Sequence, residues 1–245
     1  MSEATPATPT APGSTTAPTT AAAAAAAAPA AKTEPGPGPG PGPGPGSGPA
    51  PETPRHQIRA AHTATTVTVY QAYAPHLGVP AARDGRFPPA WKRERMTWIK
   101  PSFLWMMYRC GWAAKADQET VLAVEISREG FDRALAQACL SHYVPGVHAD
   151  REAWKASLAG SPARVQWDPE RDLHLNPLPH RSLQLGLSGP ASRAYADEWT
   201  VSIRDVTPLA REIHGLVRAG DLDAARALLP AETPYPAGPL PHLGA

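Results

Sequence analysis

The sequence lacks the features that would place it in several common classes of protein. Its two cysteines, Cys110 and Cys139, stand alone in apolar surroundings, which excludes a disulfide framework and predicts reduced core thiols. It also lacks an apolar run long enough to span a bilayer, and its first residues do not form a secretory signal. We therefore expect a soluble, cytoplasmic protein that does not bind membranes.

The small net charge and the lack of several known motifs narrow the possible classes of protein further. Removing Lys32, Glu3, Glu34 and Glu52 of the N-terminal tail leaves 22 basic and 19 acidic residues, too small an excess to predict nucleic-acid binding from charge alone. The histidines lack the spacing of a zinc hydrolase, so we expect no metal site. Serine-hydrolase, cysteine-nucleophile and kinase motifs are absent as well.

Residues 1–54 lack large apolar side chains. They contain an alanine run at 21–28 and an alternating Pro-Gly tract at 35–46. Such a segment cannot bury enough surface to offset the entropy lost on ordering, so we predict a disordered low-complexity tail. Residues 55–230 are sufficient for one domain, and the Pro-rich residues 231–245 are expected to be loose.

Alternating β-branched and aromatic residues predict the clearest strand at 65–73, and a nearly continuous apolar run predicts a central strand at 120–127. Further strands are expected at 164–168, 181–187 and 199–206, with a loop at 168–180. Helices are expected near 79–83 and at 101–110, 130–143, 150–158, 190–196, 207–220 and 221–230. The irregular alternation predicts an α+β fold with a mixed, mainly antiparallel sheet flanked by helices.

The densest group of large side chains lies at residues 95–112, where a buried helix is expected to begin at Pro101. The start of a helix presents unpaired N–H groups, so a phosphate could bind there. The supporting side chains would be Arg95, Lys100, Ser102 and Arg109, with Trp98 or Trp105 stacking a ring. The alternative is that the tryptophans are core residues and the basic groups pair with surface carboxylates.

Two other strands carry candidate residues. Tyr70 and Gln71, near the end of the first long strand, could line a cleft, or Tyr70 could pack at the edge of the core. Gln184 lies between the small residues Ser182 and Gly186 on the face opposite three leucines, which indicates either room for a ligand or a solvated sheet face.

Several segments together resemble the uncharacterised family called domain of unknown function 4291. They include Arg59-Ala60, residues 66–73, the long motif at 95–108, residues 128–131 and Gln184 to Leu187 with residues 199–207. The chain also resembles, at the level of fold, the ADP-ribosyltransferase-like proteins, with Tyr70 and Gln184 at corresponding places. Gln184 stands where a glutamate is usual, which argues against ordinary protein-directed transfer.

Three hypotheses follow. The first is an enzyme acting on a nucleotide or a nucleic-acid end, with Tyr70, Gln184 and Lys100 as catalytic residues. Its substrate would be bound by Arg59, Gln71, Arg95, Trp98, Ser102, Trp105 and Arg109. The second is a non-catalytic nucleotide- or RNA-binding module built from the same residues. The third is a structural or interaction protein without a ligand. The expected partner is a phosphate-containing small molecule or an RNA end, and NAD and ATP are the candidate cofactors.

Overall fold

The computed structural model describes residues 53–245, so the tail predicted over residues 1–54 lies outside the described residues except for its last two. The elements in chain order are β1 (Arg59–Ala60), β2 (Thr66–Tyr73), α1 (Pro75–Asp84), β3 (Thr97–Ile99), α2 (Phe103–Cys110), β4 (Thr120–Ser127), α3 (Arg128–Ala136), β5 (Ala138–Leu140), α4 (Arg151–Gly160), β6 (Ala163–Arg171), β7 (Pro177–Leu187), α5 (Pro190–Ala194), a π-helical turn (Tyr195–Trp199), β8 (Thr200–Asp205), α6 (Thr207–Ala219), α7 (Leu222–Ala227), β9 (Thr233–Pro234) and a 3-10 turn (Pro241–Leu243).

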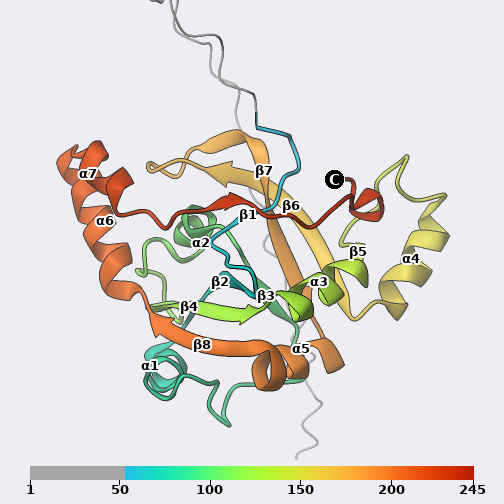
Figure 1. The fold of residues 1–245 in the computed structure, drawn as a ribbon, viewed down its shortest axis with the longest axis horizontal. Coiled ribbons are helices and arrows are strands. Elements are labelled where there is room, and N and C mark those ends of the chain that lie inside the picture. Colours follow the sequence, from blue (N-terminus) through green and yellow to red (C-terminus); the bar gives the residue numbers. More distant parts are fainter. Residues whose placement is uncertain (1–52) are drawn as a thin grey trace, which may run out of the picture. The chain divides into compact units, whose positions relative to one another are not determined.

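The strands form two larger sheets and a small one (Figure 1). Their strand orders are β2-β4-β8, β3-β7-β6-β5 and β1-β9, and only the pairing of β5 with β6 is parallel. Among residues 53–245, one isolated β-bridge connects the larger sheets, and in it the Tyr70 amide donates to the Lys100 carbonyl at 2.7 Å. The predicted α+β class with a mixed, mainly antiparallel arrangement is confirmed.

β4 is the central strand of its sheet, as its apolar sequence predicts. It pairs with β2 on one side and β8 on the other, and Val121 to Val124 and Ile126 are buried. The alternation in β2 divides its side chains between two cores, since Val67 and Val69 pack in one cluster and Tyr70 in another. Both faces of this sheet are therefore covered.

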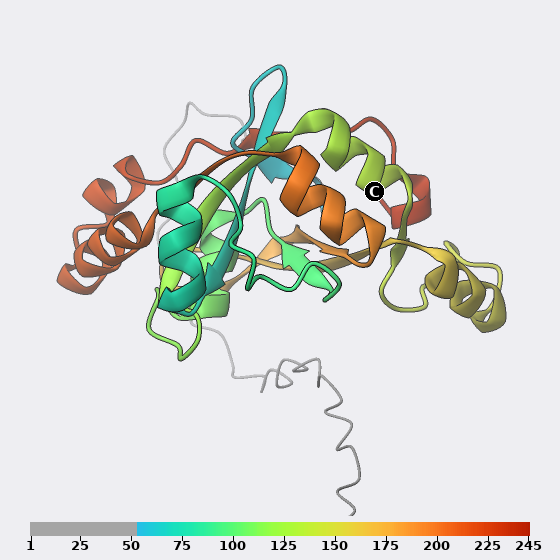
Figure 2. The same cartoon turned by 90° about the horizontal axis from the view of Figure 1, so that it is seen from below.

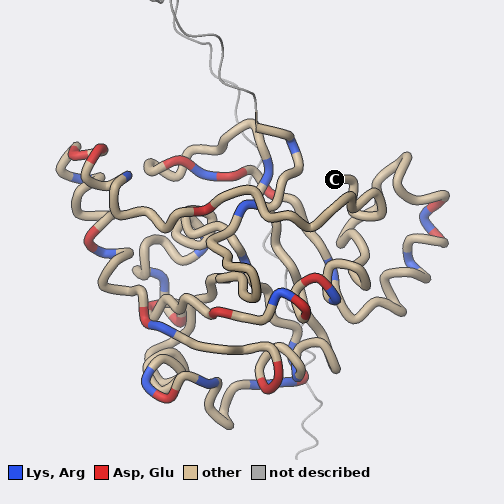
Figure 3. The backbone as a smooth tube through the Cα atoms, viewed as in Figure 1, with Lys and Arg blue, Asp and Glu red and all other residues tan. Residues whose placement is uncertain are grey.

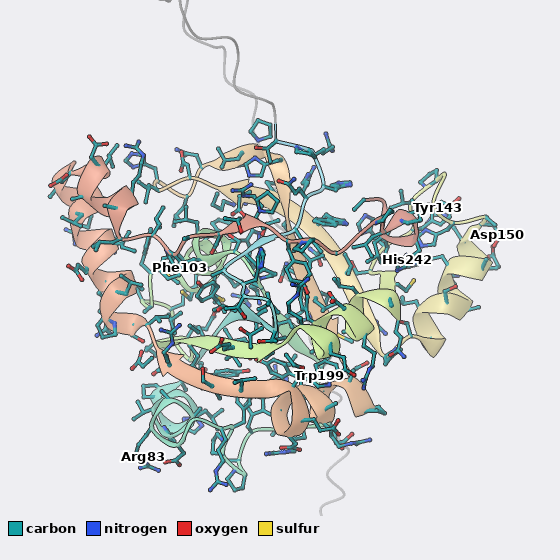
Figure 4. The ribbon with its side chains drawn as sticks, in the orientation of Figure 1. Arg83, Phe103, Tyr143, Asp150, Trp199 and His242 are labelled. Carbon is teal, nitrogen blue, oxygen red and sulfur yellow. The ribbon has the colours of Figure 1, made fainter. Side chains whose placement is uncertain are left out.

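The two cores contain different elements. The first joins both larger sheets to α3 and the helical segment 190–199, and the second joins β2 and β4 to α2, α6 and α7. Phe103 of α2 lies well inside the domain, whereas Arg83 of α1 lies at its edge (Figure 4). Seen from below, α1 and α5 both lie on the near side (Figure 2), and α1 packs on β8.

The helix predicted at 130–143 ends at Ala136 and is followed by strand β5, and strand β3 was not predicted. Caps and prolines act locally at two further differences from the sequence-based expectation. The helix predicted from Pro101 begins at Phe103, because Ser102 takes the N-cap position and accepts from the Trp105 amide. The loop predicted at 168–180 is mostly a hairpin of β6 and β7, in which Pro177 opens a strand and Pro169 lies next to a register shift.

The C-terminal segment, expected to be loose, is packed onto the domain. β9 pairs with β1, and the side chains of Tyr235, Leu240 and Leu243 are buried. The indole of Trp167 donates to the Leu243 carbonyl at 2.9 Å. The burial of these three apolar side chains stabilises the packed segment, although its proline content predicted a loose end.

Both cysteines are buried and unpaired thiols, as expected. Across residues 53–245, none of the helices combines the length and the apolar character needed to cross a membrane.

We predict opposite effects for two helix glycines. A Cβ at Gly130 of α3 would lie 2.4 Å from the Trp199 ring, so Gly130→Ala should lower the free energy of unfolding by about 1–3 kcal/mol. A Cβ at Gly215 of α6 meets nothing within 4 Å, so Gly215→Ala should raise it by about 0.5–1 kcal/mol. Urea unfolding of both variants checks this, and stabilisation by both would contradict the packing assigned to Trp199.

Candidate functional site

A cleft of about 540 Å³ opens beside the bridge between β2 and β3. Its volume is in the range that holds small-molecule ligands. Its lining combines basic and aromatic side chains: His76, Lys92, Arg95, Lys100, Arg109, Tyr73, Trp91 and Trp98. Asp117 is the one acidic residue among the described residues that line it, so the cleft is short of negative charge.

Lys100 is the buried cation of this cleft, with only 6% of its surface exposed. Its Nζ donates to the Trp98 carbonyl at 3.0 Å and lies 5.5 Å from the centroid of the Trp105 ring. Burial lowers the pKa of Lys100 to about 7, and the positive charge of Arg109 acts in the same direction, while Asp168 opposes both. The neutral form of Lys100 is therefore accessible near neutral pH, unlike that of an ordinary lysine.

Trp98 forms an aromatic wall of the cleft. A Cβ on Gly186 of β7 would lie 3.1 Å from the Trp98 ring, so the indole rests directly on the glycine backbone. The room that the sequence suggested beside Gln184 is therefore partly filled by Trp98. Since Trp98 also lines the cleft and is only half-buried, one part of its ring is available for stacking.

Gln184 lies behind the cleft rather than in it. It pairs with Gln166 across β7 and β6, and the Nε2 groups of both glutamines donate to the carboxylate of Asp168. Gln184 is buried. This arrangement fixes the carboxylate whose negative charge supports the protonated form of Lys100.

At the start of α2, where an anion was predicted to bind, two carboxylate oxygens of the protein already accept hydrogen bonds. The Phe103 amide donates to Glu232 Oε1 at 2.7 Å, and the Ser102 hydroxyl donates to Glu170 Oε1 at 2.8 Å. Burial raises the pKa of Glu232 to about 8, and the nearby charge of Glu170 adds to this, although the Phe103 N–H favours the ionised form. The helix start is therefore capped from within the chain.

Charge elsewhere is more evenly distributed. Basic and acidic positions are interspersed along the described chain (Figure 3), so the basic lining of the cleft is a local feature. Within residues 53–245, no group of three or more His, Cys, Asp or Glu side chains is arranged to hold a metal ion.

Comparison with known families agrees with the resemblance noted in the sequence. The family described as domain of unknown function (DUF4291) matches residues 57–235, which is well over half of the chain. The chain belongs to the DUF4291 family. No curated protein matches it.

In this DUF4291 chain the cleft brings together five of the predicted residues: Gln71, Arg95, Trp98, Lys100 and Arg109. Gln71 has a structural part there, because its amide nitrogen donates to Thr97 Oγ1 at 2.6 Å and its oxygen accepts from the Tyr195 hydroxyl at 2.7 Å. Arg95 and Arg109 are exposed and accessible to a ligand.

The other predicted residues do not line the cleft. The Tyr70 ring packs edge-on against Phe103 in the second core, and burial raises its pKa above the usual value. Arg59 donates to the Glu232 carbonyl at 2.9 Å. Trp105 is buried over Lys100, and Ser102 caps α2.

Asp168 and Glu232 are the residues of this region that sequence reasoning missed. The alternation of residues 164–168 places Asp168 on the polar face of β6, which was a usable signal. Glu232 lies in a segment that was expected to be loose, and no local pattern indicates that it reaches α2.

The burial of Glu232 predicts a pH-dependent stability. Since its folded pKa of about 8 exceeds the usual value near 4.5, the unfolded chain loses this proton first. The contribution of protonated Glu232 to the free energy of unfolding should be complete below pH 4.5 and should be lost as the pH rises to 8. We expect Glu232→Gln, which keeps an acceptor for the Phe103 N–H, to raise the free energy of unfolding at pH 8 by at least about 1 kcal/mol.

Urea unfolding at pH 5 and pH 8 measures this difference, and Glu152→Gln on the exposed surface of α4 is the matched control. Equal effects of Glu232→Gln at both pH values would contradict a buried, protonated Glu232.

Proposed function

We propose that the cleft binds a nucleotide, or the phosphorylated end of a nucleic acid, and that the protein is an enzyme acting on it. The observation that carries this proposal is the buried Lys100 beside Arg109 in a cleft with little negative charge. Two neighbouring cations repel each other unless an anion lies between them. A phosphate or pyrophosphate bound between Lys100 and Arg109 would remove that repulsion and is the ligand class that fits.

The aromatic lining supports a nucleotide over a simple phosphate. Trp98 rests on Gly186 and is partly exposed along the cleft, so it can stack a base or a nicotinamide ring. Trp91 is less suitable, because it is buried and donates to the Tyr73 hydroxyl at 2.9 Å. Arg95 and Lys92 at the rim add positive charge for further phosphates.

Lys100 also gives the cleft a group suited to catalysis. An amine whose pKa lies near neutrality can accept or donate a proton under working conditions, which an ordinary lysine does poorly. The carboxylate of Asp168 accepts hydrogen bonds from Gln184 and Gln166, and its negative charge would favour the protonated form of Lys100. The likeness to ADP-ribosyltransferase-like proteins noted in the sequence makes NAD the first nucleotide to test, and ATP the second.

A non-catalytic binding module would use the same residues, and turnover separates the two functions. Incubation with NAD, ATP or 5′-phosphorylated RNA, followed by chromatography of the products, detects turnover. Product formation that is lost in Lys100→Met supports the enzyme, and binding without product supports the module.

Replacement of Lys100 tests the site. Wild-type protein should be stabilised by the true ligand, by about 2.7 kcal/mol when the ligand is at 100 times its dissociation constant. Lys100→Met should abolish this shift. The unliganded variant should itself be more stable at pH 7, by roughly 2 kcal/mol, because a lysine with a lowered folded pKa destabilises the fold at every pH below its unfolded value.

Thermal unfolding with each ligand at millimolar concentration measures both effects, and Lys155→Met on the exposed surface of α4 is the control. If none of the ligands shifts the wild-type transition, the cleft does not bind nucleotides.

Binding should weaken as the pH rises. In the free protein the neutral form of Lys100 increasingly predominates as the pH rises above its pKa of about 7, and this form must take up a proton to pair with a phosphate. Affinity should fall by up to about tenfold per pH unit between pH 7.5 and 9. Lys100→Arg remains charged and should lose this dependence. Titration calorimetry at three pH values checks the slope, and the same slope in both proteins would exclude Lys100 as its cause.

A further inference from the structure

A second cavity, of about 250 Å³, lies apart from the cleft and shares none of its lining residues. It is located where β5, β6 and β7 meet the chain before β1 and the C-terminal residues. Its lining residues are Arg55, His56, Leu140, His142, Val144, Trp167, Arg181, Leu243 and Gly244. The proposed function makes no use of them.

The cavity gathers basic side chains without an acidic one. Arg55, Arg181, His56 and His142 contribute to its lining, and none of the described lining residues is Asp or Glu. Within residues 53–245, neither arginine forms an ion pair. Two guanidinium groups without a carboxylate partner are the usual setting for binding a phosphate or carboxylate.

Backbone contacts hold together the two segments that carry these side chains. The Arg181 amide donates to the Arg55 carbonyl at 2.7 Å, and His56 forms a parallel bridge with Arg181, so the segment before β1 lies along β7. This pairing places the backbones of Arg55 and Arg181 side by side at the cavity that both residues line. The fold therefore positions both segments before any ligand binds.

The His56 ring is also fixed in orientation. It stacks on Trp167 with ring centroids 5.0 Å apart, and its Nδ1 lies 2.5 Å from the Gly244 carbonyl oxygen. Since a carbonyl only accepts, Nδ1 is the donor in this hydrogen bond and Nε2 remains for another partner. Trp167 is held in turn by its hydrogen bond to the Leu243 carbonyl.

The remaining lining is apolar and comes from Leu140, Val144, Trp167 and Leu243. An anion-binding rim over an apolar floor fits a molecule with both characters. We propose that this cavity is a second ligand site, which takes a small phosphomonoester whose apolar or aromatic body lies against Trp167 and whose phosphate is bound by Arg55 and Arg181. This inference does not depend on the nucleotide site.

Calorimetric titration of phenyl phosphate into the full chain tests the proposal. Arg181→Gln and Arg55→Gln should each weaken binding by roughly tenfold or more, since each removes charge-assisted hydrogen bonds. Arg211→Gln, on α6 at the far end of the domain (Figure 1), should leave the affinity within about twofold. Inorganic phosphate should bind more weakly than phenyl phosphate, because it lacks the apolar body.

Lys100→Met separates this site from the cleft. Phenyl phosphate should still bind to Lys100→Met, and adding Arg181→Gln to that variant should weaken the remaining binding by roughly tenfold. Binding that is lost in Lys100→Met and kept in Arg181→Gln would place the ligand in the cleft and overturn the proposal. Absence of binding to the wild-type chain at millimolar phenyl phosphate would overturn it as well. The histidine ring spectrum of each unliganded variant should match that of the wild type, which guards against loss of binding by misfolding. Phenyl phosphate should move the His56 signals in the wild type, Arg211→Gln and Lys100→Met, and move them less at the same concentration in Arg181→Gln and Arg55→Gln.

Discussion

The hydrogen bond between the Tyr70 amide and the Lys100 carbonyl is the connection on which the cleft depends. It is the bridge between the two larger sheets, and the residues on either side of it point in different directions. Tyr70 enters the second core, while Gln71 turns toward Thr97 and the carbonyl of Trp98. That same carbonyl accepts from Lys100 Nζ, so the sheet connection and the position of the buried cation are parts of one network.

Near this network the protein buries two ionisable side chains that it does not pair with each other. Lys100 lies in the cleft and Glu232 at the start of α2, and burial shifts the pKa of each toward the neutral form. An opposite charge within a few ångströms would have cancelled much of that cost. A fold selected only for stability would have an apolar residue at Lys100, and this cost is the reason for the proposal that Lys100 binds a ligand.

Sequence patterns predicted the structure where the residues of a single strand or helix determine it. The alternation of β2 and the apolar run of β4 predicted both strands, and the residues of the dense segment 95–112 include part of the cleft lining. These patterns could not decide whether Tyr70 lies in the cleft or in the core. Both faces of β2 are buried, and alternation does not say which face would meet a ligand. The partner of Gln184 required the register of β6 on β7, and the cap of α2 required a residue 129 positions away.

The pairing of β1 with β9 has a consequence for how the domain assembles. Arg59 and Pro234 stand opposite each other in that small sheet, and Glu232 beside it caps the helix that carries the cleft wall. Contacts between residues this distant in the chain slow folding, because the long intervening segment must first be closed into a loop. The Ser102 cap of α2 is local, whereas the hydrogen bond from the Phe103 amide to Glu232 forms only when the C-terminal segment packs against β1, so the start of α2 is completed only after the two ends of the domain have met.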